Sequence, residues 1–376
     1  IVAMLGRRGD PAALAAVTAA IGDKTPAVRL AAYAALPRLA GKQAVAQLLK
    51  ALATADARDI ATISEVIARQ PGDTTLGEIA TALPKFPADA QVSLLDVLAN
   101  RGAKVQAAVV LASAKSDAPA VRLAALKAMA KLASSADAQA LIDLAVAAKD
   151  EPEEAAAIRA AVAAALQITP ADQQADALIA AMAKASGAKR AALIRPLAKI
   201  GGAKALAAVQ AELAVSADAA LRTLAEWPDV AALPELLKQA KAQQEVTPQV
   251  IALRGAINLA RTSSMSSADK IKTYTEAMAL CRRPDEKKQI LGALASERTL
   301  ASLDLAAGGL DDPATRAEAA IAAVTIALPE KGAALKGDKV LEILTEATPL
   351  CPDAKLKERA QQYLNANRKQ PDKKNP

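Results

Sequence analysis

The chain has 376 residues and a formal net charge of +7, with 47 Lys and Arg against 40 Asp and Glu. It contains no His and only two Cys, which excludes Ser-His-Asp and Cys-His nucleophiles, His-containing zinc sites and a disulfide framework. Hydrophobic residues make up 53% but aromatic residues only 1%, so the apolar content is Ala, Leu, Ile and Val, and we expect an all-α protein without a metal or a cofactor.

The first helix with a clear signature is "TPAVRLAAYAALPRLA" at 25–40, which recurs as "APAVRLAALKAMAKLA" at 118–133. Ten of the sixteen positions are identical, and the offset of 93 residues equals three repeats of 31. Pro26 and Pro119 mark the helix starts, since a Pro at the first helical position loses no hydrogen bond. Equivalent starts follow at Ala57, Ala88, Pro152, Gly187, Ala217, Pro248, Pro284, Pro313 and Pro352.

Each repeat also has another helix, which precedes the helix with the marked start. Such helices are predicted at 11–23, 42–53, 137–149, 203–214 and 229–241. Short links that carry Gly or Asp separate the helices, because Gly ends a helix readily. The repeating unit is therefore helix, turn, helix and turn in about 30–40 residues.

A basic side chain three residues after the helix start recurs along the chain. It is present as Arg29, Arg122, Arg190 and Arg316. We expect these residues to form a ladder along one edge of the stacked helices, where each arginine holds its turn by pairing with loop carbonyls or with the preceding Asp. The alternative is that the ladder binds anions.

The segments 25–41, 118–133 and 311–324 resemble the second helix of HEAT repeats, with the Asp-Pro start, the Arg that follows and the Ala/Leu stripe. The resemblance implies a right-handed, armadillo-like α-solenoid (an α-α superhelix) of about eleven HEAT-like helix pairs over residues 1–365. Residues 366–376 are polar, basic and Pro-bearing, as in a tail or linker.

A narrower resemblance covers residues 221–296, which are similar to HEAT segments of large exported bacterial proteins. Some of those proteins carry a jelly-roll domain that acts on sugars or a cytochrome c domain, but no CxxCH motif or strand-rich region is present here. "LGRRG" (5–9) aligns with "LANRG" (98–102), so we expect Ile1 to lie inside a repeat helix of a longer polypeptide, with any export signal upstream.

Several other residue types in the sequence have structural explanations. Cys281 and Cys351 occupy the same phase two repeats apart, which places them too far apart for a disulfide and predicts free thiols. Carboxylate pairs such as Glu153/Glu154 sit at helix starts, where capping and the helix dipole account for them. The five scattered aromatic residues, Trp227 among them, are interpreted as packing residues rather than stacking platforms.

The function that this pattern favours is a non-enzymatic protein–protein interaction scaffold. The second helix of each HEAT pair usually lines the concave side of the stack, and its outward positions here are predominantly basic, which predicts an acidic or extended protein partner. Two alternatives stay open, a non-catalytic arm of a larger exported carbohydrate-active or redox protein and a nucleic-acid-binding HEAT protein. The candidate partner-binding residues are Arg38, Lys127, Lys131, Lys199 and Arg254.

Overall fold

The computed structural model describes residues 1–367, and every regular element in this range is helical. The chain divides into two compact units, the first comprising Ile1–Pro196 and the second beginning at Leu197. The boundary falls within α13 (Gly187–Ile200). Because the tail predicted at 366–376 lies almost wholly outside the described residues, it stays a prediction.

The first unit alternates longer and shorter helices. Its helices, with the short 3₁₀ turns (η) that precede several of them, are α1 (Val2–Arg8), η1 (Pro11–Ala13), α2 (Leu14–Ala20), α3 (Pro26–Ala40), η2 (Gly41–Gln43), α4 (Ala44–Leu52), α5 (Ala57–Ala68), α6 (Asp73–Ala82), η3 (Leu83–Lys85), α7 (Ala88–Asn100), η4 (Lys104–Gln106), α8 (Ala107–Ser113), α9 (Pro119–Leu132), η5 (Ser135–Asp137), α10 (Ala138–Ala147), α11 (Glu151–Ala165), η6 (Ala171–Gln173) and α12 (Asp176–Lys184).

The second unit continues the same alternation. Its helices are α14 (Gly202–Glu212), α15 (Ala217–Ala225), η7 (Val230–Ala232), α16 (Leu233–Ala242), α17 (Val246–Thr262), α18 (Ser267–Leu280), α19 (Pro284–Leu294), α20 (Leu300–Ala307), α21 (Arg316–Ala327), α22 (Asp338–Leu350) and α23 (Ala354–Asn367).

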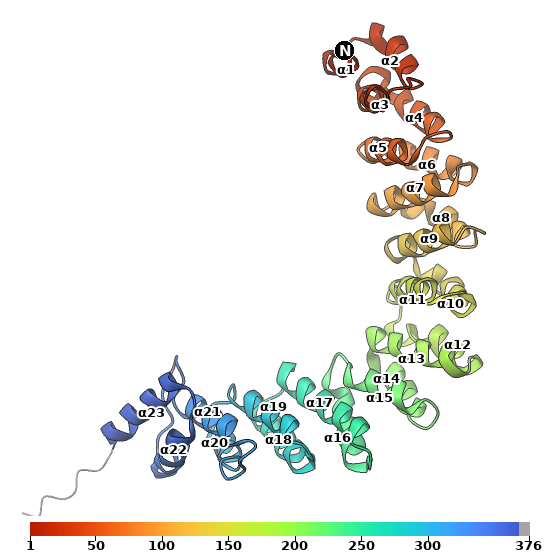
Figure 1. The fold of residues 1–376 in the computed structure, drawn as a ribbon. Helices are drawn as coiled ribbons and strands as arrows, with labels where there is room; N and C mark the ends of the chain where they lie inside the picture. Colours follow the sequence, from red (N-terminus) through yellow and green to blue (C-terminus); the bar gives the residue numbers. More distant parts are fainter. Residues whose placement is uncertain (368–376) are drawn as a thin grey trace, which may run out of the picture. The chain divides into compact units, whose positions relative to one another are not determined.

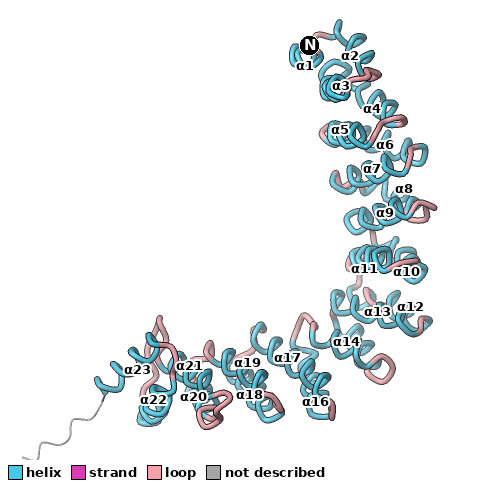
Figure 2. Tube along the Cα trace, viewed as in Figure 1, coloured by secondary structure: helices cyan, strands magenta, loops and turns pink. Residues whose placement is uncertain are grey.

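Each unit is a stack of helix pairs in two layers (Figures 1 and 2). In the first unit, α1, α3, α5, α7, α9 and α11 pack side by side in one layer, which we name the A layer, and each contacts its successor. The other helices of this unit form the B layer, and they are α2, α4, α6, α8, α10 and α12. In the second unit α15, α17, α19, α21 and α23 form the A layer, and α16, α18, α20 and α22 the B layer. This arrangement confirms an all-α solenoid.

The predicted helix starts coincide with the observed ones for most A-layer helices and for α13. The matches are Pro26, Ala57, Ala88, Pro119, Gly187, Ala217 and Pro284. Elsewhere α11 begins one residue early, α17 two residues early and α23 two residues late. The largest difference is at Pro313, because α21 begins only at Arg316.

A hydrogen-bonded turn explains the late start of α21. The Asp312 carboxylate accepts a hydrogen bond of 3.0 Å from the backbone N–H of Ala314, and the Asp312 carbonyl accepts one of 2.8 Å from the N–H of Arg316. The Thr315 hydroxyl donates to the carbonyl of Gly309 at 3.0 Å and fixes the turn against the preceding helix. Residues 313–315 therefore form a turn, and the prediction of a helix start at Pro313 is wrong by three residues.

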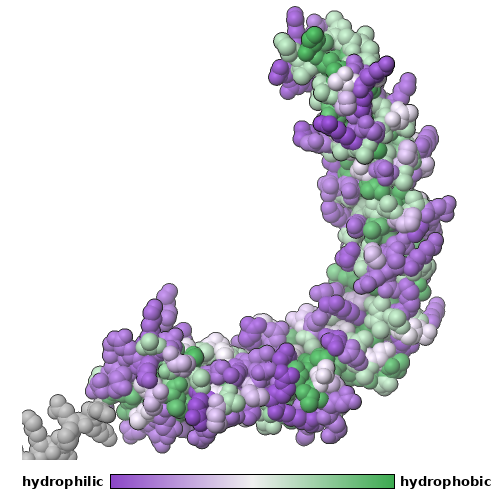
Figure 3. Space-filling view, in the orientation of Figure 1, coloured by the Kyte–Doolittle hydropathy of each residue, from purple (hydrophilic) through white to green (hydrophobic). Residues whose placement is uncertain are grey.

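Small side chains let the A-layer helices approach closely. The buried apolar residues of α11 are all alanines, at Ala156, Ala157, Ala160, Ala161, Ala164 and Ala165. In α17, Gly255 lies so close to α15 that a Cβ atom there would meet the Cα of Ala225 at 2.7 Å. Val121 of α9 is 0% exposed, as predicted. Figure 3 shows hydrophilic and hydrophobic side chains interspersed on the visible surface. The Ala-rich composition thus serves close helix packing.

Both thiols are free, as predicted. Cys281 follows α18 and is half-buried, and Cys351 follows α22 and is buried. Burial, reinforced by Glu286, raises the pKa of Cys281 to about 11, and burial also raises the pKa of Cys351. Among residues 1–367, none of the helices is long and apolar enough to cross a membrane.

Candidate functional site: charged residues of the A layer

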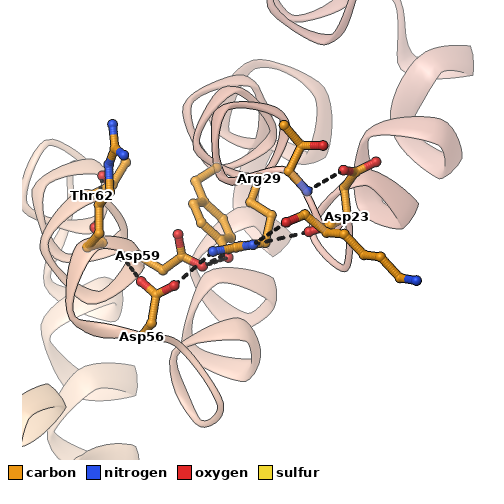
Figure 4. A network of polar contacts seen from close by, with 9 residues as sticks. Asp23, Arg29, Asp56, Asp59 and Thr62 are labelled. Atoms are coloured by element: carbon orange, nitrogen blue, oxygen red, sulfur yellow. Dashed lines mark hydrogen bonds and ion pairs between the residues drawn. The ribbon is translucent and has the colours of Figure 1, made fainter.

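Arg29 of α3 joins its own loop to the next repeat (Figure 4). Its Nη1 donates to the carbonyls of Asp23 and Lys24 at 3.2 and 3.4 Å, which fixes the loop before α3. Its Nε and Nη2 donate to Oδ2 of Asp59 at 2.6 Å and Oδ2 of Asp56 at 2.8 Å, both from the start of α5. The hydrogen bond to Asp59 raises the pKa of Arg29.

Arg122 of α9 repeats this arrangement in a more buried setting. Its Nη1 donates to the carbonyls of Ser116 and Asp117, both at 3.0 Å. Its Nε and Nη2 lie 2.8 and 2.6 Å from Oε1 of Glu153, at the start of α11. The two residues are 8% and 5% exposed, so the ion pair is almost fully withdrawn from water.

The carboxylates in both pairs occupy the third position of an A-layer helix. Asp59 in α5 and Glu153 in α11 donate their backbone N–H groups to the capping carboxylates of Asp56 and Asp150, in each case at 2.9 Å. A negative charge at this position interacts favourably with the helix dipole and with the arginine of the preceding repeat. The contacts to loop carbonyls were expected from the sequence, whereas the pairs between repeats were not. Glu153 is more than a helix-start residue, because it also binds Arg122. The available signal was a carboxylate 30 or 31 residues after each arginine.

The other two ladder arginines differ from this pattern. Arg190 is half-buried and also interacts with a neighbouring group. Arg316 donates only at 3.5 Å to the carbonyl of Asp311, and its buried Nε has no hydrogen-bond partner. Lys287, three residues after Pro284, instead reaches forward to Asp312 at 3.2 Å. The hydrogen bond from Ala314 and the ammonium of Lys287 lower the pKa of Asp312.

The second unit has its own charged contacts between repeats. Arg254 of α17 lies 2.9 Å from Oε1 of Glu286 in α19, which is 1% exposed, so the guanidinium predicted to face a partner is paired with the next repeat. Lys288 of α19 lies 2.8 Å from Oε1 of Glu318 in α21, and this contact lowers the pKa of Glu318.

A related contact buries the carboxylate of Glu297, beyond the end of α19. Burial raises its pKa, but hydrogen bonds from Ser267 and Lys270 at the start of α18 outweigh this effect and leave the pKa lowered. The Lys270 ammonium lies 3.3 Å from Oε1 of Glu297. The cluster joins α18 to the link that follows α19.

The remaining partner-binding candidates are exposed. Arg38 lies in α3, Lys127 and Lys131 lie one turn apart in α9, and Lys199 lies in α13 in the second unit. Lys131 donates to Oδ1 of Asn100 in the preceding A-layer helix at 2.8 Å. Within residues 1–367, Arg38, Lys127 and Lys199 form no ion pair.

Comparisons with known proteins agree with this repeat geometry. The family model for HEAT repeats matches residues 1–68. The fold is also similar to that of a chain in a structure described as a homology model of the full-length AP-3 complex in an intermediate open conformation. The TM-score is 0.61 and the sequence identity is 10%, and the match covers 97% of this chain and 77% of the other. The chain has the fold of an α-solenoid, and its first 68 residues match HEAT repeats. No curated protein matches it.

The aromatic residues of the solenoid serve packing. Trp227 is 2% exposed and Tyr274 is 0% exposed. Tyr33 is 2% exposed and donates to Oδ2 of Asp59 at 3.1 Å, and burial together with this carboxylate raises the pKa of Tyr33 to about 12. The remaining two, Phe86 and Tyr363, are half-buried. None of the five rings is fully exposed to stack on a ligand.

Proposed function

We propose that this HEAT solenoid is a non-enzymatic scaffold that binds another protein through the exposed cations of its A-layer surface. The observation that carries the proposal is the division of the A-layer charges into two sets. Arg29 and Arg122 are paired between repeats. Arg38 and Lys127 are exposed and form no ion pair within the described chain.

These exposed cations favour an acidic partner. The apolar stripe of each A-layer helix is committed to the core, so the outward positions supply the contacts that remain. Charge complementarity accelerates encounter and selects among partners more than it adds raw affinity. An acidic and extended protein segment therefore fits this surface better than a compact apolar one.

A single-stranded nucleic acid fits the surface less well. Proteins that bind single strands combine cations with aromatic rings on which bases stack. In this chain Tyr33, Trp227 and Tyr274 are buried and the other two rings are half-buried. The cations alone support only the salt-sensitive binding that any basic surface shows toward polyanions.

The test is recovery of partners from the cells that produce the protein. A triple variant, Arg38→Glu, Lys127→Glu and Lys131→Glu, reverses three exposed charges of the A layer. The matched control reverses three exposed lysines at the first B-layer helices of the same unit, Lys42, Lys50 and Lys85.

We expect the unmodified protein and the control to recover the same partners, and the triple variant to lose them while circular dichroism shows unchanged helicity. If the triple variant recovers the same partners as the control, the A-layer cations are not the binding surface. If the unmodified protein recovers no specific partner, the scaffold function itself is contradicted.

A further inference from the structure

One outward position of the A-layer helices recurs with a strict spacing of 31 residues. Three of its residues, Arg7, Arg69 and Asn100, were not among those that the sequence pattern singled out. The position comprises Arg7, Arg38, Arg69, Asn100 and Lys131, which we name the basic row.

All five side chains are exposed and lie at or next to the carboxyl ends of five successive A-layer helices, α1, α3, α5, α7 and α9. The hydrogen bond of 2.8 Å from Lys131 to Asn100 shows that side chains 31 residues apart meet across adjacent helices. Adjacent helices pack about 8–10 Å apart, so the row presents a polar group about every 10 Å.

The helix dipole accounts for part of this pattern, because cations are favourable near helix carboxyl ends. It does not by itself place these side chains at one position repeated every 31 residues, and the neighbouring row, one turn earlier on the same helices, differs from the basic row. That row has the same spacing but mixed chemistry, with Ala34, Glu65, Asp96 and Lys127. The basic row therefore contains no carboxylate, unlike the neighbouring row, whose Glu65 and Asp96 flank it with negative charge.

We propose that the basic row binds one extended acidic polypeptide segment that carries a carboxylate at every third residue. An extended chain rises about 3.3 Å per residue, so three residues span about 10 Å and match the helix spacing. The Oδ1 of Asn100 accepts from Lys131, which leaves its amide N–H groups to donate to a carbonyl of the bound segment.

The flanking carboxylates argue against a broad anionic partner. Glu65 and Asp96 repel a phosphate-rich surface such as a bilayer or a duplex, while a single chain that follows the row avoids them. Arg69 bonds to Glu65 in the same helix, but both side chains are exposed, at 74% and 62%, so this pair is weak and yields to a better-placed anion.

The inference rests on the proposed function and is tested by the spacing of the charges. Fluorescence anisotropy would compare two labelled peptides of the same composition, six repeats of Glu-Ser-Gly and three repeats of Glu-Glu-Ser-Ser-Gly-Gly, in low salt. A dT oligonucleotide and vesicles containing phosphatidylserine serve as the other polyanions.

We expect the Glu-Ser-Gly peptide to bind at least about threefold more tightly than the Glu-Glu-Ser-Ser-Gly-Gly peptide. The variant Arg38→Glu/Arg69→Glu should bind the Glu-Ser-Gly peptide about tenfold more weakly than the unmodified protein does. The control Lys50→Glu/Lys85→Glu makes the same charge change in and beside the B layer and should leave binding unchanged. Circular dichroism checks that both variants remain helical.

Equal affinity for the two peptides, or tighter binding of the oligonucleotide or the vesicles, would overturn the proposal. The same holds if Arg38→Glu/Arg69→Glu binds no more weakly than the control. If one of these results is found while the unmodified protein still recovers native partners from cells, only the proposal for the basic row is wrong. If no partner is recovered either, the scaffold function fails with it.

Discussion

Removing the carboxylate of Glu153 should destabilise the first unit locally. In the native protein this carboxylate accepts from Nε and Nη2 of Arg122 at 2.8 and 2.6 Å, and the two side chains are 6% and 10% exposed. Glu153→Ala leaves the guanidinium with only the carbonyls of Ser116 and Asp117.

The cost follows from this burial. Breaking a buried ion pair by removing one partner costs about 3–5 kcal/mol, because the remaining charge stays out of water without compensation. Replacing both partners by apolar residues of similar size removes that penalty, so Arg122→Met/Glu153→Leu should be close to neutral or stabilising. The exposed pair of Glu65 and Arg69 provides a control, since such pairs contribute little.

Hydrogen exchange read by mass spectrometry suits a repeat protein, because its stability is a sum of local terms. Peptides from α9 and α11 of Glu153→Ala should exchange about 10²-fold faster, which corresponds to the lower end of the expected cost. Glu65→Ala and the apolar double variant should exchange like the unmodified protein. If Glu153→Ala exchanges no faster than Glu65→Ala, the pair does not hold the two repeats together.

Three further predictions concern packing and the thiols. Gly255→Ala should destabilise the protein by about 1–3 kcal/mol in chemical denaturation, because the added Cβ overlaps α15. Gly292→Ala, at a helical glycine with open space around it, should instead stabilise by about 0.5–1 kcal/mol, and the same sign for both would refute the packing argument. Val121→Asp should cost several kcal/mol by the same assay, since it buries an unpaired charge, and a change typical of surface sites would contradict the helix phase. Cys281 and Cys351 should react slowly with a thiol reagent at neutral pH, because their raised pKa values disfavour the thiolate. After denaturation without reductant the protein should react with two equivalents of the reagent, and an intramolecular disulfide found by mass spectrometry would contradict this.

The local pattern of the sequence was enough to predict the helices and their phase. Pro26 and Pro119 begin α3 and α9, and Val121 is buried. These features depend on the fixed φ of proline and on the 3.6-residue period, both of which act within one helix. The HEAT resemblance followed because the same local solution recurs along the chain.

The pairing of charges was decided by the tertiary structure. Arg29 was identified from its position in the repeat, but its partner Asp59 lies in the next repeat, and Arg254 looked like a free outward cation until Glu286 was placed beside it. Which side chains meet depends on how far one helix is rotated and shifted against its neighbour. The late start of α21 has a similar cause, because Thr315 bonds to Gly309 across a turn that no helical period describes. A sequence read one helix at a time contains the period of each helix, but not the stagger between helices that turns isolated charges into pairs.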